Sequence, residues 1–253
     1  MATSKLSRSQ RKAAAVLGRT LASRGFALAG GAALQAHGVG DRTTDDLDSF
    51  TSLADELPAA FDVAISALRQ AGFEVTVDRR YDTFCRLEVV SGRTKRRPFG
   101  VDLGVDSIMW QPDATAFGPT LSIRELAANK VLTAFGRNEP RDLYDLEQLS
   151  SRVSLRRAVR DASAKDLGFD AQVFTEMISM TLSKPTSEWP AGTDLAAVRR
   201  VCALLVSEAR AATAGSGQGD GLDLGTIRDR SEGMVAPYRR RDGTYVRGYR
   251  RHR

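Results

Sequence analysis

Residues 28–50 read LAGGAALQAHGVGDRTTDDLDSF, and this stretch decides how the rest of the chain is interpreted. A short apolar run ends at Gly30 and Gly31, a helical segment follows, and an Asp-x-Asp pair, Asp46 and Asp48, comes next. Alternate side chains of a strand share one face, so the two carboxylates would lie roughly 6.6 Å apart along the strand. Such a pair can hold one or two divalent ions, and Mg²⁺ prefers oxygen ligands of this kind.

The two glycines form a predicted turn before a helix at residues 32–37. Free backbone N–H groups at a helix N-terminus favour phosphate, and glycine lets a ligand approach the backbone closely. A third metal-binding carboxylate is expected on a neighbouring strand, with Asp102 as first choice and Asp106 as second. The alternative is that Asp46 and Asp48 belong to a solvated strand edge. Asp45 points away from its neighbours and is interpreted as solvent-facing.

A second group of candidate residues lies in a predicted helix at residues 122–135 and in the helix after it. Lys130 adjoins the apolar face of the first helix and could neutralise triphosphate oxygens, as could Arg137 at its end. Asp145 could hold Lys130 by an ion pair or act as a base, and Asp142 shares its helical face. The alternative is a surface lysine with an apolar stem, beside a solvated acidic face.

The order of predicted elements divides the chain into a mixed α/β part at residues 1–121, a helical part at 122–211, and a linker with a basic tail at 212–253. Ser122 and Glu125, three residues apart, predict a capping box at the start of the helical part. Helices are predicted at residues 8–24, 32–37, 59–71, 122–135, 140–149, 154–164, 170–182 and 194–211. Strands are predicted at residues 26–29, 47–51, 73–77, 83–90 and 99–105.

Composition narrows the chemistry that this chain can perform. The 253 residues are 42% hydrophobic and 27% charged, which is ordinary for a globular protein. No apolar run reaches the ~18 residues of a membrane helix, and no secretion signal is visible, so a cytoplasmic location is expected. Two cysteines and two histidines leave little for a disulfide framework, a zinc site or a Ser-His-Asp mechanism. Catalysis would depend on carboxylates, lysine and hard metal ions.

Together these segments resemble the AbiEii-type toxins of the DNA polymerase β nucleotidyltransferase superfamily. The resemblance covers roughly residues 20–180 and rests on GGAAL from Gly30, RTTDDLDSF from Arg42, ELAANK ending at Lys130, and RDLYDL from Arg141. It implies an α/β (α+β) fold with two lobes. The N-terminal lobe would be a nucleotidyltransferase-like mixed sheet with flanking helices, and the C-terminal lobe would be helical.

The resemblance also implies an activity. Several members are similar to toxins of toxin–antitoxin or abortive-infection systems that use an NTP with Mg²⁺ or Mn²⁺. Some add nucleotides, often pyrimidines, to the 3′ end of tRNA and so block translation. By position, Asp46 and Asp48 match the metal-binding acids, Lys130 matches the triphosphate lysine, and Asp145 matches the acid on the next helix. The implied partners are an NTP, tRNA or another RNA, and a cognate antitoxin, with no membrane.

One position departs from the family pattern. Members often carry Ser or Thr directly after the glycine turn, whereas this chain has Ala32. One hydroxyl contact to phosphate is thereby lost. The hydroxyl of Thr44, two residues before Asp46, could supply that contact from the other side.

The net charge of +6 is concentrated in the tail. Residues 228–253 contain nine arginines and three acidic residues, so the rest of the chain is neutral. Tyr238, Tyr245 and Tyr249 alternate with these arginines, a pattern that could bind phosphates and stack on unpaired bases. A solvated end and a binding site for an acidic antitoxin are the alternatives.

Two other functions stay open at this point. The enzyme could transfer the nucleotide to a protein side chain or to a small molecule such as an antibiotic. The neutral body with a basic tail argues mildly against a small-molecule acceptor. The domain could also bind a partner without catalysis, although the retained acids and Lys130 argue against that function.

Overall fold

The computed structural model describes residues 6–91, residues 97–215 and four two-residue strands between positions 234 and 250. Its backbone contacts divide the chain into two compact units. The N-terminal unit comprises residues 1–127 with 151–153, and the helical unit comprises residues 128–150 with 154–253. The expected division at residue 121 stays a prediction, and each unit is described by itself.

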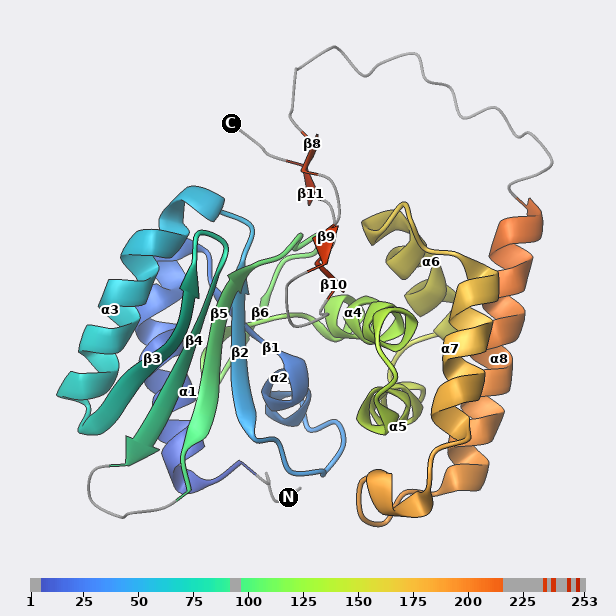
Figure 1. The fold of residues 1–253 in the computed structure, drawn as a ribbon, viewed down its shortest axis with the longest axis horizontal. Coiled ribbons are helices and arrows are strands. Elements are labelled where there is room, and N and C mark those ends of the chain that lie inside the picture. Colours follow the sequence, from blue (N-terminus) through green and yellow to red (C-terminus); the bar gives the residue numbers. More distant parts are fainter. Residues whose placement is uncertain are drawn as a thin grey trace. The chain divides into compact units, whose positions relative to one another are not determined.

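A seven-stranded sheet forms the centre of the N-terminal unit, in the order β3-β4-β5-β2-β1-β7-β6 (Figure 1). Its strands are β1 Ala27–Ala29, β2 Asp46–Thr51, β3 Phe73–Tyr81, β4 Phe84–Ser91, β5 Phe99–Val105, β6 Asp113–Thr115 and β7 Gly118–Thr120. β2 runs parallel to β5, and β1 runs parallel to β7, while the other neighbours are antiparallel. The sheet is therefore mixed, and the α/β fold class expected from the sequence is confirmed.

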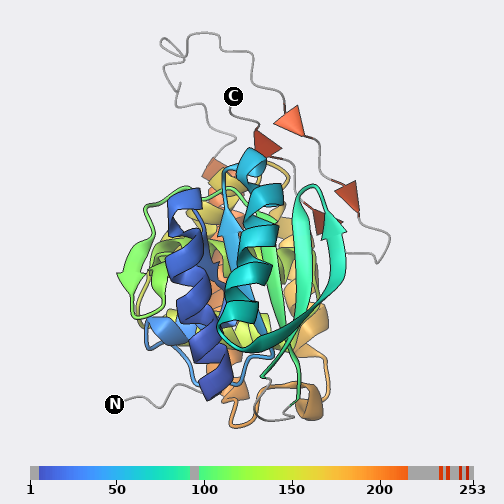
Figure 2. The same ribbon diagram turned by 90° about the vertical axis from the view of Figure 1, so that its left-hand side faces the viewer.

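Two helices, α1 Arg8–Leu21 and α3 Leu57–Gln70, pack side by side along the sheet (Figures 1 and 2). Each buries a stripe of apolar side chains, with Leu17 on α1 and Phe61 on α3 almost fully enclosed. The period of two in β2 buries Leu47 completely on one face of the sheet and turns the acidic side chains to the other face. The apolar core thus fixes which face carries the acids.

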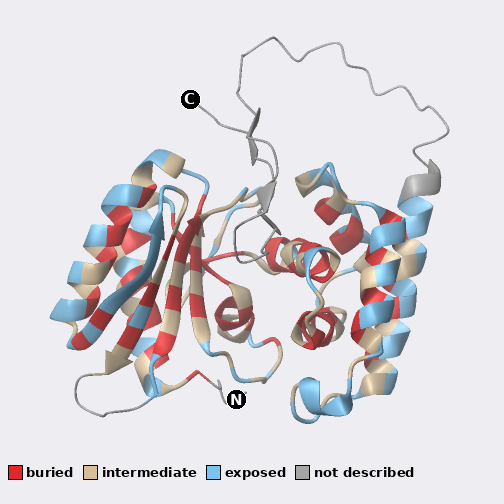
Figure 3. Ribbon diagram, viewed as in Figure 1, coloured by how far each residue is buried: buried red, intermediate tan, exposed pale blue. Residues whose placement is uncertain are grey.

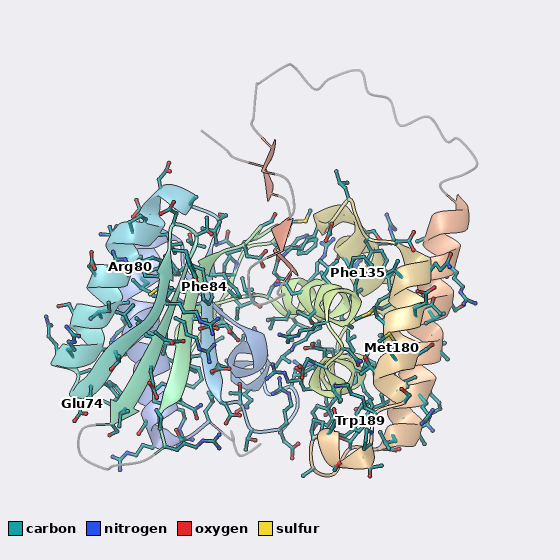
Figure 4. The ribbon with its side chains drawn as sticks, in the orientation of Figure 1. Glu74, Arg80, Phe84, Phe135, Met180 and Trp189 are labelled. Atoms are coloured by element: carbon teal, nitrogen blue, oxygen red, sulfur yellow. The ribbon has the colours of Figure 1, made fainter. Side chains whose placement is uncertain are left out.

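The helical unit contains α5 Pro140–Leu149, α6 Leu155–Lys165, α7 Ala171–Leu182 and α8 Leu195–Gly215, together with most of α4 Ile123–Gly136. α8 packs against α5, α6 and α7 through Val198, Cys202, Leu205 and Ala209, which are all buried. Figure 3 shows that α4 and α5 are largely buried, whereas α7 and α8 each have a long exposed side. Phe135, labelled in Figure 4, starts a chain of ring contacts that continues through Phe169 to Phe174.

Several element boundaries differ from the sequence-based expectation. Gly30 and Gly31 are the first residues of α2 Gly30–Ala36 and not a turn before it. In the hairpin β3–β4, strand β3 extends beyond its predicted end at residue 77. The prediction ended too early because the outer half of β3 is exposed and carries no apolar alternation. The strands β6 and β7 were not predicted, because three residues are too few for a periodic signal.

The end of the chain also differs from the prediction. α8 continues to Gly215, four residues into the predicted linker at 212–227, and residues 216–227 lie outside the described residues. Within the predicted tail, β8 Met234–Val235 pairs with β11 Tyr249–Arg250, and β9 Tyr238–Arg239 pairs with β10 Tyr245–Val246. The remaining residues of the tail lie outside the described part.

Both cysteines are free and buried, Cys85 in β4 and Cys202 in α8. Burial raises the pKa of Cys85 to about 11 and that of Cys202 to about 12, so both stay protonated at neutral pH. Across the described residues, no helix combines the length and the apolar character that crossing a membrane requires.

Candidate active site

The two predicted metal-binding acids lie on β2, and Asp102 lies on β5 beside them. In the parallel β2–β5 pair, Asp48 is directly in register with Asp102, and Asp46 is in register with Gly100. The side chains of Asp46 and Asp102 are partly exposed, at 30% and 15%. Three carboxylates from two adjacent strands therefore share the face of the sheet opposite to Leu47, which we call the acidic face.

Asp106, the second choice for a third carboxylate, occupies a different place. It follows the end of β5, where its backbone N–H donates to Thr51 O at the far end of β2. Its carboxylate accepts a hydrogen bond of 2.8 Å from the backbone of Ser107. The register thus favours Asp102 over Asp106 as the neighbour of Asp48.

An arginine that the sequence analysis did not single out lies among these acids. Arg86 on β4 is in antiparallel register with Asp102. Its Nη1 donates to both oxygens of Asp102, at 3.1 and 2.9 Å, and its Nη2 donates to Asp46 Oδ1 at 2.8 Å. Burial lowers the pKa of Arg86, the charges of Asp102 and Asp46 raise it, and the balance leaves it above its ordinary value. Arg86 therefore carries its charge at any pH of interest.

Two glycines leave the space that the acids occupy. A β-carbon at Gly30 would lie 1.9 Å from Asp48 Oδ2, and Gly30 has φ +61°, which other residues rarely adopt. A β-carbon at Gly100 would lie 2.3 Å from Asp46 Oδ1 and 2.7 Å from Arg86 Nη2. Both glycines are thus needed for the carboxylates to lie where they do.

The second glycine of the motif, Gly31, lies beside two polar side chains. Its absent β-carbon would be 2.9 Å from Arg42 Nη2 and 3.2 Å from the Thr44 hydroxyl. Thr44 also donates that hydroxyl to the backbone oxygen of Asp46 at 3.2 Å. Arg42 adds a cation at the start of α2 that the sequence analysis had not named as a site residue. The signal for it was present, since Arg42 opens the RTTDDLD segment.

The predicted triphosphate residues lie in the helical unit and form a cluster of ion pairs, in which Lys130 is buried and Arg137 is partly exposed. Lys130 Nζ on α4 lies 2.9 Å from Asp142 Oδ1 and 2.6 Å from Asp145 Oδ2 on α5. Arg137 Nε and Nη2 donate to the two oxygens of Asp142 at 2.7 and 3.0 Å. Lys130 is 6% exposed, Asp142 0% and Asp145 2%, so the alternative of a surface lysine beside a solvated acidic face is wrong.

The electrostatics of this cluster are dominated by its cations. Burial by itself would raise the pKa of Asp142, but the charge of Lys130 and the hydrogen bonds from Arg137 outweigh it. The pKa of Asp142 is therefore held well below its ordinary value of 3.8. Lys130 is held between two carboxylates, which confirms the expected ion pair with Asp145. The assignment of Lys130 and Arg137 to nucleotide and of Asp145 to catalysis stays a prediction.

The residues of the acidic face fit one common mode of magnesium binding. Among the described residues, no group of three or more His, Cys, Asp or Glu side chains lies close enough to hold a metal ion by protein ligands alone. Mg²⁺ is usually bound by one or two carboxylates together with waters and substrate phosphates. Asp46 and Asp48, which Gly30 and Gly100 allow to lie where they do, suit that mode.

A hollow of about 440 Å³ on the N-terminal unit lies elsewhere. It is lined by residues of α3, such as Asp62 and Arg69, and by Val77 of β3. None of the predicted site residues contributes to it.

A mixed sheet, two acids two residues apart on its central strand, and a helix opened by two glycines define a nucleotidyltransferase-like domain. The family model described as "Nucleotidyl transferase AbiEii toxin, Type IV TA system" matches residues 14–198. The chain belongs to this AbiEii family and is a nucleotidyltransferase of the toxin–antitoxin type. The resemblance inferred from the sequence is confirmed.

Solved structures with the same fold include three bacterial proteins. A putative nucleotidyltransferase from H. pylori is 16% identical, with a TM-score of 0.55 over 85% of this chain and 100% of that one. JHP933 from Helicobacter pylori is 16% identical, with a TM-score of 0.54 over 81% and 94%. The nucleotidyltransferase toxin MenT4 from Mycobacterium tuberculosis is 18% identical, with a TM-score of 0.53 over 79% and 85%. A search of curated protein sequences finds no match.

Proposed function

We propose that this protein is a magnesium-dependent toxin that transfers a nucleotide from an NTP to the 3′ end of tRNA and thereby blocks translation. The observation that carries the proposal is the register of β2 and β5, which sets Asp48 beside Asp102 with Asp46 on the same face. Paired carboxylates on adjacent strands are the protein groups that phosphoryl transfer with divalent metal requires.

The proposal assigns these roles to residues of the chain. Asp46 and Asp48, helped by Asp102, would hold Mg²⁺ or Mn²⁺, and Gly30 leaves the space that the Asp48 carboxylate occupies. The N–H groups of Gly30 and Gly31, with the hydroxyl of Thr44, bind phosphate oxygens. A divalent cation, when bound, supplies Lewis-acid activation of the α-phosphate and stabilises the leaving pyrophosphate.

The reaction balances without any further reactant. The RNA 3′ oxygen bonds to the α-phosphorus, the bond from that phosphorus to the bridging oxygen breaks, and pyrophosphate leaves. The hydroxyl proton passes to a carboxylate of the acidic face. Lys130 is assigned to the triphosphate, as the family resemblance implies, and Arg137 is assigned to it by its place at the end of the same helix. Asp145 is assigned to holding Lys130 by their ion pair.

The helical unit supplies a basic surface suited to RNA. Arg157 and Arg160 lie on the exposed side of α6, beside Arg156, which pairs with Glu208 of α8 at 3.0 Å. Clustered arginines neutralise phosphates without reading sequence. This surface favours an RNA acceptor over a small molecule.

A transfer assay tests the proposal directly. The protein is incubated with each α-labelled NTP, total tRNA and Mg²⁺, and the label is followed in RNA, in protein and in small molecules. We expect label in tRNA, lost in Asp46→Asn and in Asp48→Asn and retained in Asp45→Asn, whose side chain is exposed on the same segment. Label in protein or in a small molecule would show that the acceptor is not RNA. No label in any fraction would reject catalysis.

A further inference from the structure

Arg86 links acids from two different strands and is the feature of the acidic face that the proposed function leaves unexplained. It reaches Asp102 directly across the β4–β5 pair and extends over Gly100 to Asp46. Its side chain is only 34% exposed, so these contacts are partly shielded from water. Partial burial strengthens the ion pairs relative to exposed ones.

Arg86 lies against carboxylates from three strands. Asp46 and Asp102 accept its hydrogen bonds, and Asp78 Oδ2 lies 3.9 Å from Arg86 Nε and 3.6 Å from Arg79 Nε. Carboxylates gathered at one site repel one another unless a cation lies between them. In the protein without metal, Arg86 provides that cation.

Asp46 and Asp102, which Arg86 holds, are two of the three carboxylates assigned to the divalent ion. Both oxygens of Asp102 and Oδ1 of Asp46 accept hydrogen bonds from Arg86. We propose that Arg86 is a built-in counter-cation of the metal site, which holds Asp46 and Asp102 before the divalent ion binds and must release Asp102 when it does. This inference rests on the proposed function, because it assumes that the acidic face binds metal.

The release of Arg86 requires another partner for its charge. A guanidinium binds phosphate oxygens through two parallel hydrogen bonds, and an incoming triphosphate offers such oxygens. Metal and nucleotide therefore assist each other's binding, because the nucleotide draws away the group that competes with the metal. Arg86 makes metal binding depend on nucleotide.

The test measures Mn²⁺ affinity from the electron paramagnetic resonance signal of free Mn²⁺, with and without a non-hydrolysable NTP. Arg86→Gln is expected to bind Mn²⁺ at least about tenfold tighter than the wild type without nucleotide, because one competing charge is removed. Nucleotide should strengthen Mn²⁺ binding more in the wild type than in this variant. In EDTA, Arg86→Gln should unfold at a lower temperature than the wild type, and Mn²⁺ should remove that difference.

Arg80→Gln is the matched control. Arg80, labelled in Figure 4, is an arginine on the neighbouring strand β3 that pairs with Asp62 of α3 at 2.9 Å. Its loss removes the same charge from the unit without touching Asp46 or Asp102, so its Mn²⁺ affinity should equal that of the wild type. Arg86→Lys keeps the charge but cannot span both carboxylates, and it should also bind Mn²⁺ more tightly than the wild type.

The outcomes separate this inference from the proposed function. If the wild type binds Mn²⁺ and transfers nucleotide, but neither Arg86→Gln nor Arg86→Lys binds Mn²⁺ more tightly than it does, the counter-cation role is rejected and the function stands. If Arg86→Gln does not fold, Arg86→Lys alone decides by the same criterion. If the wild type binds no Mn²⁺ with or without nucleotide, the metal-dependent function is rejected together with this inference.

Discussion

Asp48 lies directly against Gly30, where strand β2 passes the first residue of α2. A β-carbon at position 30 would be 1.9 Å from the Asp48 carboxylate, a distance that no side chain can adopt. The first glycine of the motif therefore has a role that is separate from any contact with phosphate. It determines where the second acid of the Asp-x-Asp pair can lie.

Gly30→Ala should abolish nucleotide transfer and weaken Mn²⁺ binding, because the new methyl group displaces Asp48. The matched control is Gly38→Ala at the other end of α2, where φ is +69° and nothing lies within 4 Å of the new β-carbon. Gly38→Ala should cost about 1–2 kcal/mol from the left-handed backbone alone. Gly30→Ala should cost at least about 1 kcal/mol more from overpacking. Urea unfolding measures the stability of the two variants, and Mn²⁺ titration measures their metal affinity. Equal stability and equal Mn²⁺ affinity of the two variants would contradict the role of Gly30 in placing Asp48.

Gly100→Ala should slow nucleotide transfer by forcing Asp46 and Arg86 apart. Its β-carbon would approach their charged ends to 2.3 and 2.7 Å. Gly104→Ala, on the same strand and at the same sheet face, is the control, since its β-carbon meets ring atoms of Phe50 at 3.2 and 3.3 Å. We expect near-normal rates for Gly104→Ala in a single-turnover assay. Similar transfer rates for the two variants would show that Asp46 can move without loss of activity.

Asp142→Asn should destabilise the helical unit by about 3–5 kcal/mol at pH 7, because Lys130 and Arg137 lose the charge between them. The pKa of Asp142 is depressed in the folded protein, so its contribution is complete above the unfolded value of 3.8 and is lost as the pH falls below it. The stability gap between wild type and variant should therefore narrow below about pH 4. Denaturant unfolding across pH 3–7 measures the gap.

The surface pair of Asp62 with Arg80 gives the control for that experiment. Asp62→Asn removes a charge from an exposed ion pair and should leave the stability at pH 7 nearly unchanged. A gap between wild type and Asp142→Asn that stays constant down to pH 3 would show that the ion pairs of Asp142 contribute nothing.

Reversing two charges on α6, with Arg157→Glu and Arg160→Glu together, should weaken tRNA binding. Each phosphate contact that is lost should reduce the slope of log affinity against log salt by about 0.7–0.9. The same change at the exposed Arg199 and Arg200 of α8 is the control. Filter binding at several salt concentrations measures the affinity and its slope. An unchanged slope in the α6 variant would exclude this surface as the RNA site.

The acidic face was predictable from the sequence because its geometry is local. A period of two places Asp46 and Asp48 on one side of a strand wherever that strand lies in the sheet. Asp102 was identified by the same alternation in its own segment. What the sequence could not provide was the register between β2 and β5, which decides that Asp102 and not Asp106 lies beside Asp48.

Arg86 and Lys130 show why the remaining features were harder to predict. In the segment Phe84–Ser91, alternation places Arg86 and Glu88 on the same face of the strand and does not mark either as a site residue. Only the pairing with β5 brings Arg86 to Asp102. Lys130 adjoins an apolar helical face, which fits both a surface lysine and a buried one. Whether Lys130 is buried depends on α5, whose Asp142 and Asp145 form ion pairs with its ammonium group. Both cases depend on contacts between segments distant in the sequence.

The protonated, enclosed state of Cys85 and Cys202 has a practical consequence. Maleimide dyes react with thiolates, so the native protein should take up almost no label at neutral pH. A single cysteine introduced at the exposed Leu53 of the N-terminal unit and another at the exposed Leu167 of the helical unit would then carry a fluorophore pair without removing any native thiol. Energy transfer between the dyes would follow the spacing of the two units through a turnover, with the chain otherwise unaltered.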